Sequence, residues 1–445
     1  MSSIFTIARL TVKLAMRSGA LWGVLALVVA TSSFLFFAST GDGHLVNELQ
    51  VRVQYSFGLT YSLLTLMVIA LSVFTVRSQL DEKQLHMLTS RPVSRPQVLI
   101  GQWLGMVVIA GVAEFALLMT IAGASSLLGR GYNADERALA DAQLGTVRYE
   151  AQAARKPFAD QVADRINTLR ADGTVTGAMS PELRKEIEQQ IRRDQQIVPV
   201  GGQREWRFVL SDRVSTGETA ELRYKIYADN QRQPVRGSFR VWSANSPETF
   251  EQAFEAEPFR SHVMQIPLDQ FPKSHEVMVE LKNGSDRELY LGRTQGLRLY
   301  YVDGSMSGNA AKAFGLHLLH LAVVAAIGLM AGVAFTFPVA AFMVMVLFLL
   351  SIGAGFFQQV VRETRLEGSE MSALDQAAVA VTSFGIWLTK GMQPPSVVER
   401  FATGISIPLD SLLLSWVPGA LVYGLIAGGI GIVALKRKEL SKLQA

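Results

Sequence analysis

Charge-free apolar stretches constrain this chain more than any other feature of its sequence. A helix that spans a membrane needs about 20 mostly apolar residues. The stretch 313–361 is long enough for two such helices, and Pro338 near its centre favours a turn between them. The chain is therefore predicted to span a membrane six times, three times on either side of a charged central block. The stretches are 18–41, 53–76, 96–129, 313–361 and 411–435, and Glu114 is the one fixed charge within them.

The positions of basic residues predict the orientation of these helices. Lys and Arg collect in short loops on the cytoplasmic side of a membrane. Basic side chains outnumber acidic ones in residues 1–17, 77–97 and 436–445, whereas the segment 362–410 carries more acids than bases. With six spans the three basic segments fall on one side, so both termini are predicted to be cytoplasmic and residues 130–309 extracytoplasmic. The expected location is the inner (cytoplasmic) membrane, with the first apolar stretch kept as an anchor instead of being cleaved as a signal peptide.

Two shorter segments are predicted to lie at the membrane surface. Arg9, Lys13 and Arg17 recur every four residues beside an apolar face, which is typical of an interfacial amphipathic helix. A positively charged topology anchor is the alternative. Residues 371–387 and 397–407, both within the acidic segment between the last two spans, are expected to form interfacial or re-entrant helices on the outer face.

The central block 130–309 is expected to form an extracytoplasmic α+β domain. Residues 130–200 are charged, with apolar residues at helical spacing such as the stripe that begins at Phe158. In residues 201–305 the apolar period changes to two, which indicates strands, and Asn283-Gly284 supplies a turn. The fold class is thus an α-helical membrane protein of six transmembrane helices with an outer antiparallel β-sandwich. The strand patterns are Trp206/Phe208/Leu210, Leu222/Tyr224/Ile226, Phe239/Val241, Val277/Val279/Leu281 and Leu297/Leu299/Tyr301.

The basic loop 77–97, between the second and third spans, is the candidate site of coupling to a cytoplasmic partner. It carries a small apolar patch flanked by charges, and Pro92 ends its local helix. A short amphipathic helix with a proline exit suits docking in a groove on another protein. An ordinary solvated loop, whose arginines only fix topology, is the alternative. The predicted coupling residues are Glu82, Leu85, Met87, Leu88, Arg91, Pro92, Val93 and Arg95.

Residues 82–105 resemble the segment before the third span of ABC-2 type transporter permeases. The likeness lies in Pro92-Val93-Ser94-Arg95, which follows an acidic, leucine-containing stretch and precedes Gly101-x-x-Leu104-Gly105. Tyr423-Gly424 in the last span and the closing Arg437-Lys438-Glu439-Leu440 are also similar to the family's ending. The N-terminal Ile7-Ala8-Arg9, on an interfacial helix, fits the family as well.

The resemblance covers the six spans and the loops between them, but it does not cover residues 130–309. Permeases of this family usually have a short connection at that place, so the family's substrate cannot simply be carried over. What the resemblance implies is the membrane subunit of an ATP-binding cassette exporter of amphiphilic or lipid-linked cargo. It also implies a homodimer or a pseudo-dimeric pair of permeases, with a cytoplasmic ATPase subunit gripping residues 85–95 of each half.

The chain lacks a Gly-x-x-x-x-Gly-Lys-Ser/Thr phosphate loop, so it is not expected to be an enzyme itself. ATP and Mg²⁺ are expected on the partner ATPase, and no cofactor, metal or catalytic residue is predicted in this chain. Cysteine is absent, which excludes disulfides and thiol chemistry. The expected partners are the ATPase, a second permease subunit, membrane lipid and, through the outer domain, a periplasmic protein. Nucleic acid is not expected.

Two other classes of function stay open on the sequence. A mechanotransducing membrane subunit would use ATP to act on a periplasmic partner through the outer domain, without translocating anything. An intramembrane enzyme or a membrane-tethered receptor is the second. Catalysis in the membrane would need converging acid, base or metal groups, and Glu114 is the one fixed candidate.

Three features inside the predicted spans could have functional roles. Glu114 is a candidate because intramembrane carboxylates usually face a bundle interior or a water-filled cavity. The alternative is a protonated or hydrogen-bonded glutamate that ties two helices together. His317 and His320 share a helix face, and hydrogen bonding is favoured over metal binding because their span holds no Asp, Glu or Cys. Gly424 and Gly428 allow close helix packing, within one subunit or at a dimer seam.

Overall fold

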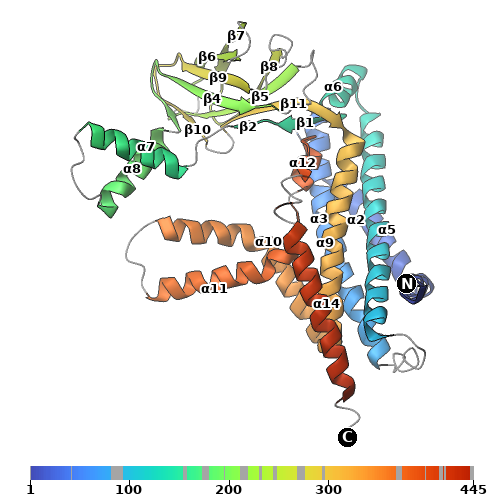
Figure 1. The fold of residues 1–445 in the computed structure, drawn as a ribbon. Coiled ribbons are helices and arrows are strands. Elements are labelled where there is room, and N and C mark those ends of the chain that lie inside the picture. The colour runs from blue at the N-terminus through green and yellow to red at the C-terminus, as the bar shows by residue number, and fades with distance from the viewer. Residues whose placement is uncertain are drawn as a thin grey trace. The chain divides into compact units, whose positions relative to one another are not determined.

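A computed structural model of the chain divides into two compact units (Figure 1). The helical unit comprises Met1–Gly145 and Met306–Ala445, and the β unit comprises Thr146–Ser305. The β unit therefore lies inside the predicted block 130–309, and the residues just before it belong to the helical unit. The structure describes residues 2–41, 43–81, 94–153, 158–172, 180–194, 196–210, 219–229, 233–243, 248–267, 276–292, 296–366, 373–395, 397–409, 414 and 417–440.

Six helices of the helical unit are long and apolar enough to cross a membrane, as expected for a multi-pass membrane protein. Their number confirms the count made from the apolar stretches. The predicted turn at Pro338 lies between α9 and α10, and the proline occupies the first turn of α10, where a missing N–H costs least. These helices are α2 (Ala20–Ala38), α3 (Leu45–Asp81), α5 (Arg95–Gly129), α9 (Met306–Ala334), α10 (Phe337–Leu366) and α14 (Val417–Leu440).

The N-terminal segment is the predicted helix, α1 (Ser2–Arg17), with Arg9, Lys13 and Arg17 exposed along it. Helix α6 (Ala134–Leu144) follows α5 and begins with Asn133, whose Oδ1 accepts a hydrogen bond of 2.8 Å from the Glu136 amide. Such an N-cap satisfies one of the amides that a helix start leaves without a partner.

The described part of the segment between the last two spans contains both predicted helices, the second shortened to five residues, and their place at the membrane surface stays a prediction. Helix α11 (Ala373–Thr389) lies beside α10 (Figure 1), and the short η2 (Lys390–Met392) and α12 (Val398–Ala402) follow it. Gly391 packs on the ring of Tyr423 from α14, where a Cβ atom would come within 2.3 Å of the ring. Glycine is therefore required at the point where η2 meets α14.

The β unit contains two antiparallel sheets. One has the strand order β1-β11-β5-β10-β3, with β8 also paired to β5, and the other has the order β2-β4-β9-β6-β7. The strands are β1 (Thr146–Glu150), β2 (Gln152–Ala153), β3 (Ile197–Val198), β4 (Gln203–Val209), β5 (Thr219–Tyr227), β6 (Val235–Trp242), β7 (Thr249–Ala256), β8 (Ser261–Pro267), β9 (Glu276–Asn283), β10 (Leu289–Leu291) and β11 (Leu297–Ser305).

The five strand patterns found in the sequence correspond to β4, β5, β6, β9 and β11, and their alternating apolar side chains lie in one core. Both sheets contribute to this core, for example through Phe208 and Val279 of one and Leu222 and Ile226 of the other. The β-sandwich itself stays a prediction, which this shared core supports.

Sequence periodicity missed six strands, among them β1 in the region predicted to be helical. β1 has five residues and β2 and β3 have two each, which is too short for a period of two to be recognised. β7 is the last strand of its sheet and is exposed over much of its length, so its apolar alternation is weak. The two predicted helices of this region are α7 (Phe158–Ala171) and α8 (Pro181–Asp194), and Ser180 caps α8 through a 3.1 Å bond from the Leu183 amide.

The predicted turn at Asn283-Gly284 is built around a fully buried asparagine side chain. The amide Nδ2 of Asn283 donates to the carbonyl oxygens of Val198, Pro199 and Arg287 at 2.8–3.1 Å. Its Oδ1 accepts from the Ser285 amide at 2.9 Å. Both polar atoms of the side chain are thus used, and they hold the turn 283–287 to the segment that contains Val198 and Pro199.

Candidate functional site

The predicted coupling segment lies mostly outside the described residues. This applies to Glu82, Leu85, Met87, Leu88, Arg91, Pro92 and Val93. Arg95 is described: it is the first residue of α5 and its side chain is half-buried. The Ser94 amide donates to Gln97 Oε1 at 3.0 Å, and Pro96 lies in the first helical turn. The Ser94-Arg95-Pro96 part of the motif is therefore a helix start.

The glycines that follow this start bring α5 into close contact with α1. A Cβ atom on Gly101 would lie 2.7 Å from Ile7 Cβ, and one on Gly105 would lie 2.7 Å from Thr11 Cβ. Either contact is too short for any other residue, so the Gly-x-x-Leu-Gly pattern serves helix packing. It fastens the N-terminal part of α5 to the basic N-terminal helix α1.

Glu114, the predicted intramembrane candidate, is fully buried halfway along α5 and contacts a histidine of α9. Its Oε1 lies 3.1 Å from Nδ1 of His317, whose side chain is also fully buried. The His317 ring stacks on the Tyr61 ring of α3 with centroids 4.0 Å apart and planes at 22°. Glu114 thus ties α5 to α9, which is the alternative that the sequence left open for it.

His320 extends this cluster toward η2 and α10. Its Nε2 lies 2.9 Å from the Met392 carbonyl oxygen, which can only accept, so Nε2 carries the proton. The neutral ring then accepts at Nδ1, and the Tyr61 hydroxyl, 2.6 Å away, is the donor. Ser351 of α10 donates to the same Met392 carbonyl at 3.0 Å. We call Tyr61, Glu114, His317 and His320 the buried polar cluster.

Sequence reasoning identified Glu114 and the two histidines separately, and the structure brings them together. It missed Tyr61, Ser351 and the carbonyl of Met392, because each lies in a different segment and none interrupts an apolar pattern. Within the described part of the chain, no group of three or more His, Cys, Asp or Glu side chains could hold a metal ion.

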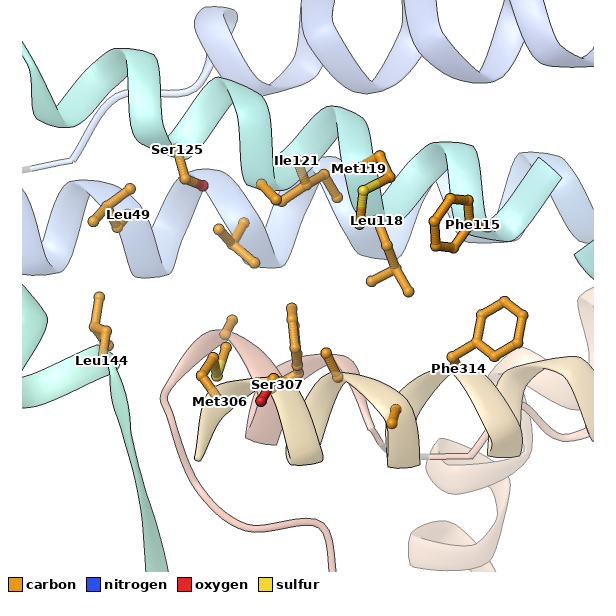
Figure 2. A pocket seen from close by; sticks show the side chains of 16 residues that line it. Leu49, Phe115, Leu118, Met119, Ile121, Ser125, Leu144, Met306, Ser307 and Phe314 are labelled. Atoms are coloured by element: carbon orange, nitrogen blue, oxygen red, sulfur yellow. The ribbon is translucent and has the colours of Figure 1, made fainter. Parts of the chain in front are cut away.

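Two apolar grooves flank the helices that carry this cluster. One of about 610 Å³ lies between α3 and α5 on one side and α9 on the other. Figure 2 shows Phe115 and Phe314 at one end of this groove and Leu49 and Leu144 at the other. The second, of about 780 Å³, is lined by α5, α9 and α14.

Four glycines of α14 line the second groove, and two of them also face α9. Gly424 faces Val323 and Gly431 faces Met330, both on α9, at ordinary contact distance. Gly428 lines the second groove and has open space where a Cβ would lie. Gly424 therefore contacts α9 of the same chain at a distance that does not require glycine, and the dimer seam stays a prediction.

In comparisons with known proteins, no family model matches the chain. No curated protein matches it either. The assignment to a function therefore depends on the sequence motifs and on the geometry of the helical unit.

Proposed function

We propose that this chain is the membrane subunit of an ATP-binding cassette exporter of the ABC-2 type. The observation that carries the proposal is the junction at Ser94 and Arg95, where the family-like motif becomes a capped helix start. From there α5 packs on α1 through Gly101 and Gly105 and continues to the buried polar cluster. A rigid helix that begins at a docking segment is suited to carry movement into a membrane.

In this proposal the ATPase acts on residues 85–95, where the chain passes from α3 to α5. Both helices line the first groove, and α9 lines its opposite side. A displacement of α3 and α5 relative to α9 would therefore widen or narrow the groove. The groove is almost entirely apolar, and its volume falls in the range of ligand sites, roughly 300–1,000 Å³. An amphiphilic or lipid-linked cargo, with its acyl chain in the groove, fits this chemistry.

The remaining parts of the proposal follow from charge and from the resemblance. The termini and the loop 77–97 are cytoplasmic, the β unit is an extracytoplasmic sandwich, and two permease subunits form a dimer above two ATPase subunits. The protein resides in the inner membrane, and ATP and Mg²⁺ are bound by the partner.

A mechanotransducing subunit is the second candidate, and one feature of the β unit favours it. β11 ends at Ser305 and α9 begins at Met306, with no connecting loop. At the other chain connection Thr146 of β1 pairs with Ser305 of β11. Both connections of the β unit thus meet in one strand pair, through which a movement of α9 could reach a periplasmic partner.

The coupling assignment is tested by purifying the tagged chain from native membranes and measuring Mg²⁺-dependent ATP hydrolysis of the purified complex. Arg95→Glu is expected to lower the co-purifying activity about tenfold or more, because it reverses a charge at the docking segment. The matched control is Arg193→Glu, an exposed arginine of α8 in the β unit. Equal ATP hydrolysis with Arg95→Glu and Arg193→Glu would remove the assignment.

A second variant separates export from mechanotransduction. Ala311→Trp places a large side chain in the first groove, which Ala311 lines from an exposed position on α9. An exporter is expected to lose cargo release into the medium while ATP hydrolysis continues. A mechanotransducer would keep its cellular activity with the groove filled, and that result would contradict the exporter.

A further inference from the structure

Two atoms of the Glu114–His317 pair have no hydrogen-bond partner among the described residues, although both side chains are fully buried. They are Glu114 Oε2 and His317 Nε2. The other atoms of the pair, Glu114 Oε1 and His317 Nδ1, lie 3.1 Å apart. Buried polar atoms are nearly always hydrogen-bonded. Two unpaired atoms in one contact therefore indicate either a ligand or another conformation in which these atoms find hydrogen-bond partners.

Among the residues that the structure describes, no contact supplies a cation to this pair, and the groups around it are already engaged. Tyr61 of α3 donates to His320, which in turn donates to the Met392 carbonyl. On α14, Tyr423 donates to the Trp387 carbonyl. Arg400, next to α9, donates to the Ser406 carbonyl at 3.3 Å.

No salt bridge among the described residues joins the pair to a charged side chain of the other helices packed near it. Helix α2 has no ionisable side chain. On α1 the basic side chains Arg9, Lys13 and Arg17 are exposed. Lys312 of α9 precedes His317 by five residues and is half-buried, and Glu399 of α12 would add a negative charge instead of cancelling one.

The charge balance of the pair determines how many protons it holds. A carboxylate against a neutral imidazole carries one net negative charge, and an uncompensated charge in an apolar interior is costly. One additional proton makes the pair neutral, either as a carboxylic acid beside an imidazole or as a carboxylate beside an imidazolium. In both forms a hydrogen lies between Oε1 and Nδ1, and α5 is bonded to α9.

We propose that Glu114 and His317 form a proton-binding site in the interior of the helical unit. The bound proton neutralises the pair at the contact of α5 with α9, so that no net charge is buried there. Glu114 Oε2 and His317 Nε2 are the atoms at which water exchanges this proton when the helices separate. The site stands on the geometry of these two residues and does not require that the chain exports a cargo.

Counting the protons released on unfolding tests this site. The purified full-length chain, in unbuffered detergent micelles at mildly alkaline pH, is unfolded with dodecyl sulfate while an indicator dye records proton release. The wild type is expected to release about one proton more than Glu114→Gln, because the unfolded chain leaves Glu114 ionised and His317 neutral. Over the same pH region the folding equilibrium of the wild type is expected to weaken about tenfold per pH unit relative to the variant.

Glu48→Gln is the matched control. Glu48 of α3 is also buried, but Arg52 Nε donates to its Oε2 at 2.6 Å and the Gly41 amide to its Oε1 at 2.8 Å. It needs no proton, so Glu48→Gln is expected to release as many protons as the wild type. Glu114→Leu, which suits an apolar interior, serves as a second variant, and size-exclusion chromatography verifies folding. Equal proton release by the wild type and by the folded Glu114 variants would overturn the proposal.

Discussion

Glu221 of the β unit and Glu114 of the helical unit are both buried carboxylates, and they are neutralised differently. In the β unit Glu221 of β5 lies between two arginines: Arg148 Nη2 is 3.0 Å from its Oε1, and Arg223 Nη2 is 3.2 Å from its Oε2. In the helical unit Glu114 has a single histidine at 3.1 Å. Glu221 is thus neutralised by fixed opposite charges, as Glu48 of the helical unit is by Arg52, whereas Glu114 has only a titratable partner.

The surroundings of each carboxylate explain why Glu221 is paired with arginines and Glu114 with a histidine. Arg223 keeps a quarter of its side chain exposed and lies over the Tyr300 ring, 4.9 Å from its centre. Burial lowers the pKa of Arg148, and the Glu221 carboxylate acts in the opposite direction. Partial contact with water and a π face make a fixed cation tolerable there. Among the apolar side chains around Glu114, a proton is the smallest cation that can do the same.

Glu221→Gln is expected to give the largest effect. It leaves Arg148 and Arg223 beside a neutral amide, so the free energy of unfolding of the β unit should fall by about 3–5 kcal/mol. Hydrogen exchange of the β5 and β9 amides, followed by mass spectrometry, measures it. Glu255→Gln is the control, because Glu255 pairs with Arg236 on the exposed surface. A loss as small as that of Glu255→Gln would contradict the claim that Glu221 is neutralised by the two arginines.

Asn283→Ala is expected to come next, with a loss of about 2–3 kcal/mol, because it leaves buried carbonyl groups without donors. The helical unit offers a matched residue, Asn309 of α9, which donates to the Ile405 carbonyl and accepts from the Ile407 amide, both at 3.0 Å. Asn309→Ala should cost about half as much, since Asn309 makes fewer bonds. Thermal unfolding with exchange at each unit's amides measures both variants, and the reverse order would contradict the bond count.

Gly105→Ala tests the packing of α5 on α1, a contact within the helical unit that should not affect the β unit. The added methyl group would overlap Thr11 on α1, so the helical unit should lose about 1–3 kcal/mol while the β unit is unaffected. Gly123→Ala on the same helix is the control, because a Cβ atom there meets nothing within 4 Å. Apparent unfolding temperatures in detergent compare the two. Equal temperatures would mean that α1 does not pack on α5 as described.

Glu114→Gln is expected to change stability least, by less than about 1 kcal/mol at neutral pH. The side-chain amide of the variant can still donate a hydrogen bond to His317 Nδ1. The net charge of the contact also stays zero, because the protonated Glu114–His317 pair is already neutral. The same measurement as for Gly105→Ala applies. A loss comparable with that of Glu221→Gln would show that Glu114 is ionised, and the difference between the two units would disappear.

The fold was predictable wherever one pattern repeats over many residues. Six apolar helices, the basic N-terminal helix and five strands follow from hydropathy and periodicity alone. The strands that were missed are short or lie at a sheet edge, where burial on one face is too slight to leave a pattern. The contact of Gly101 and Gly105 with α1 was also not predictable, because glycine spacing does not say which helix approaches.

By itself the sequence determined the number of apolar helices, the charged insertion between the third and fourth, and the presence of Glu114 and two histidines inside apolar stretches. Only the tertiary structure decided that Glu114 contacts His317, 203 positions along the chain, and that Tyr61 donates a hydrogen bond to His320. It also showed that the two atoms without a hydrogen-bond partner, Glu114 Oε2 and His317 Nε2, belong to one pair. The physical reason is that hydropathy is a local property of each segment. The partner of a buried charge is instead selected by the packing of helices that are distant in the chain.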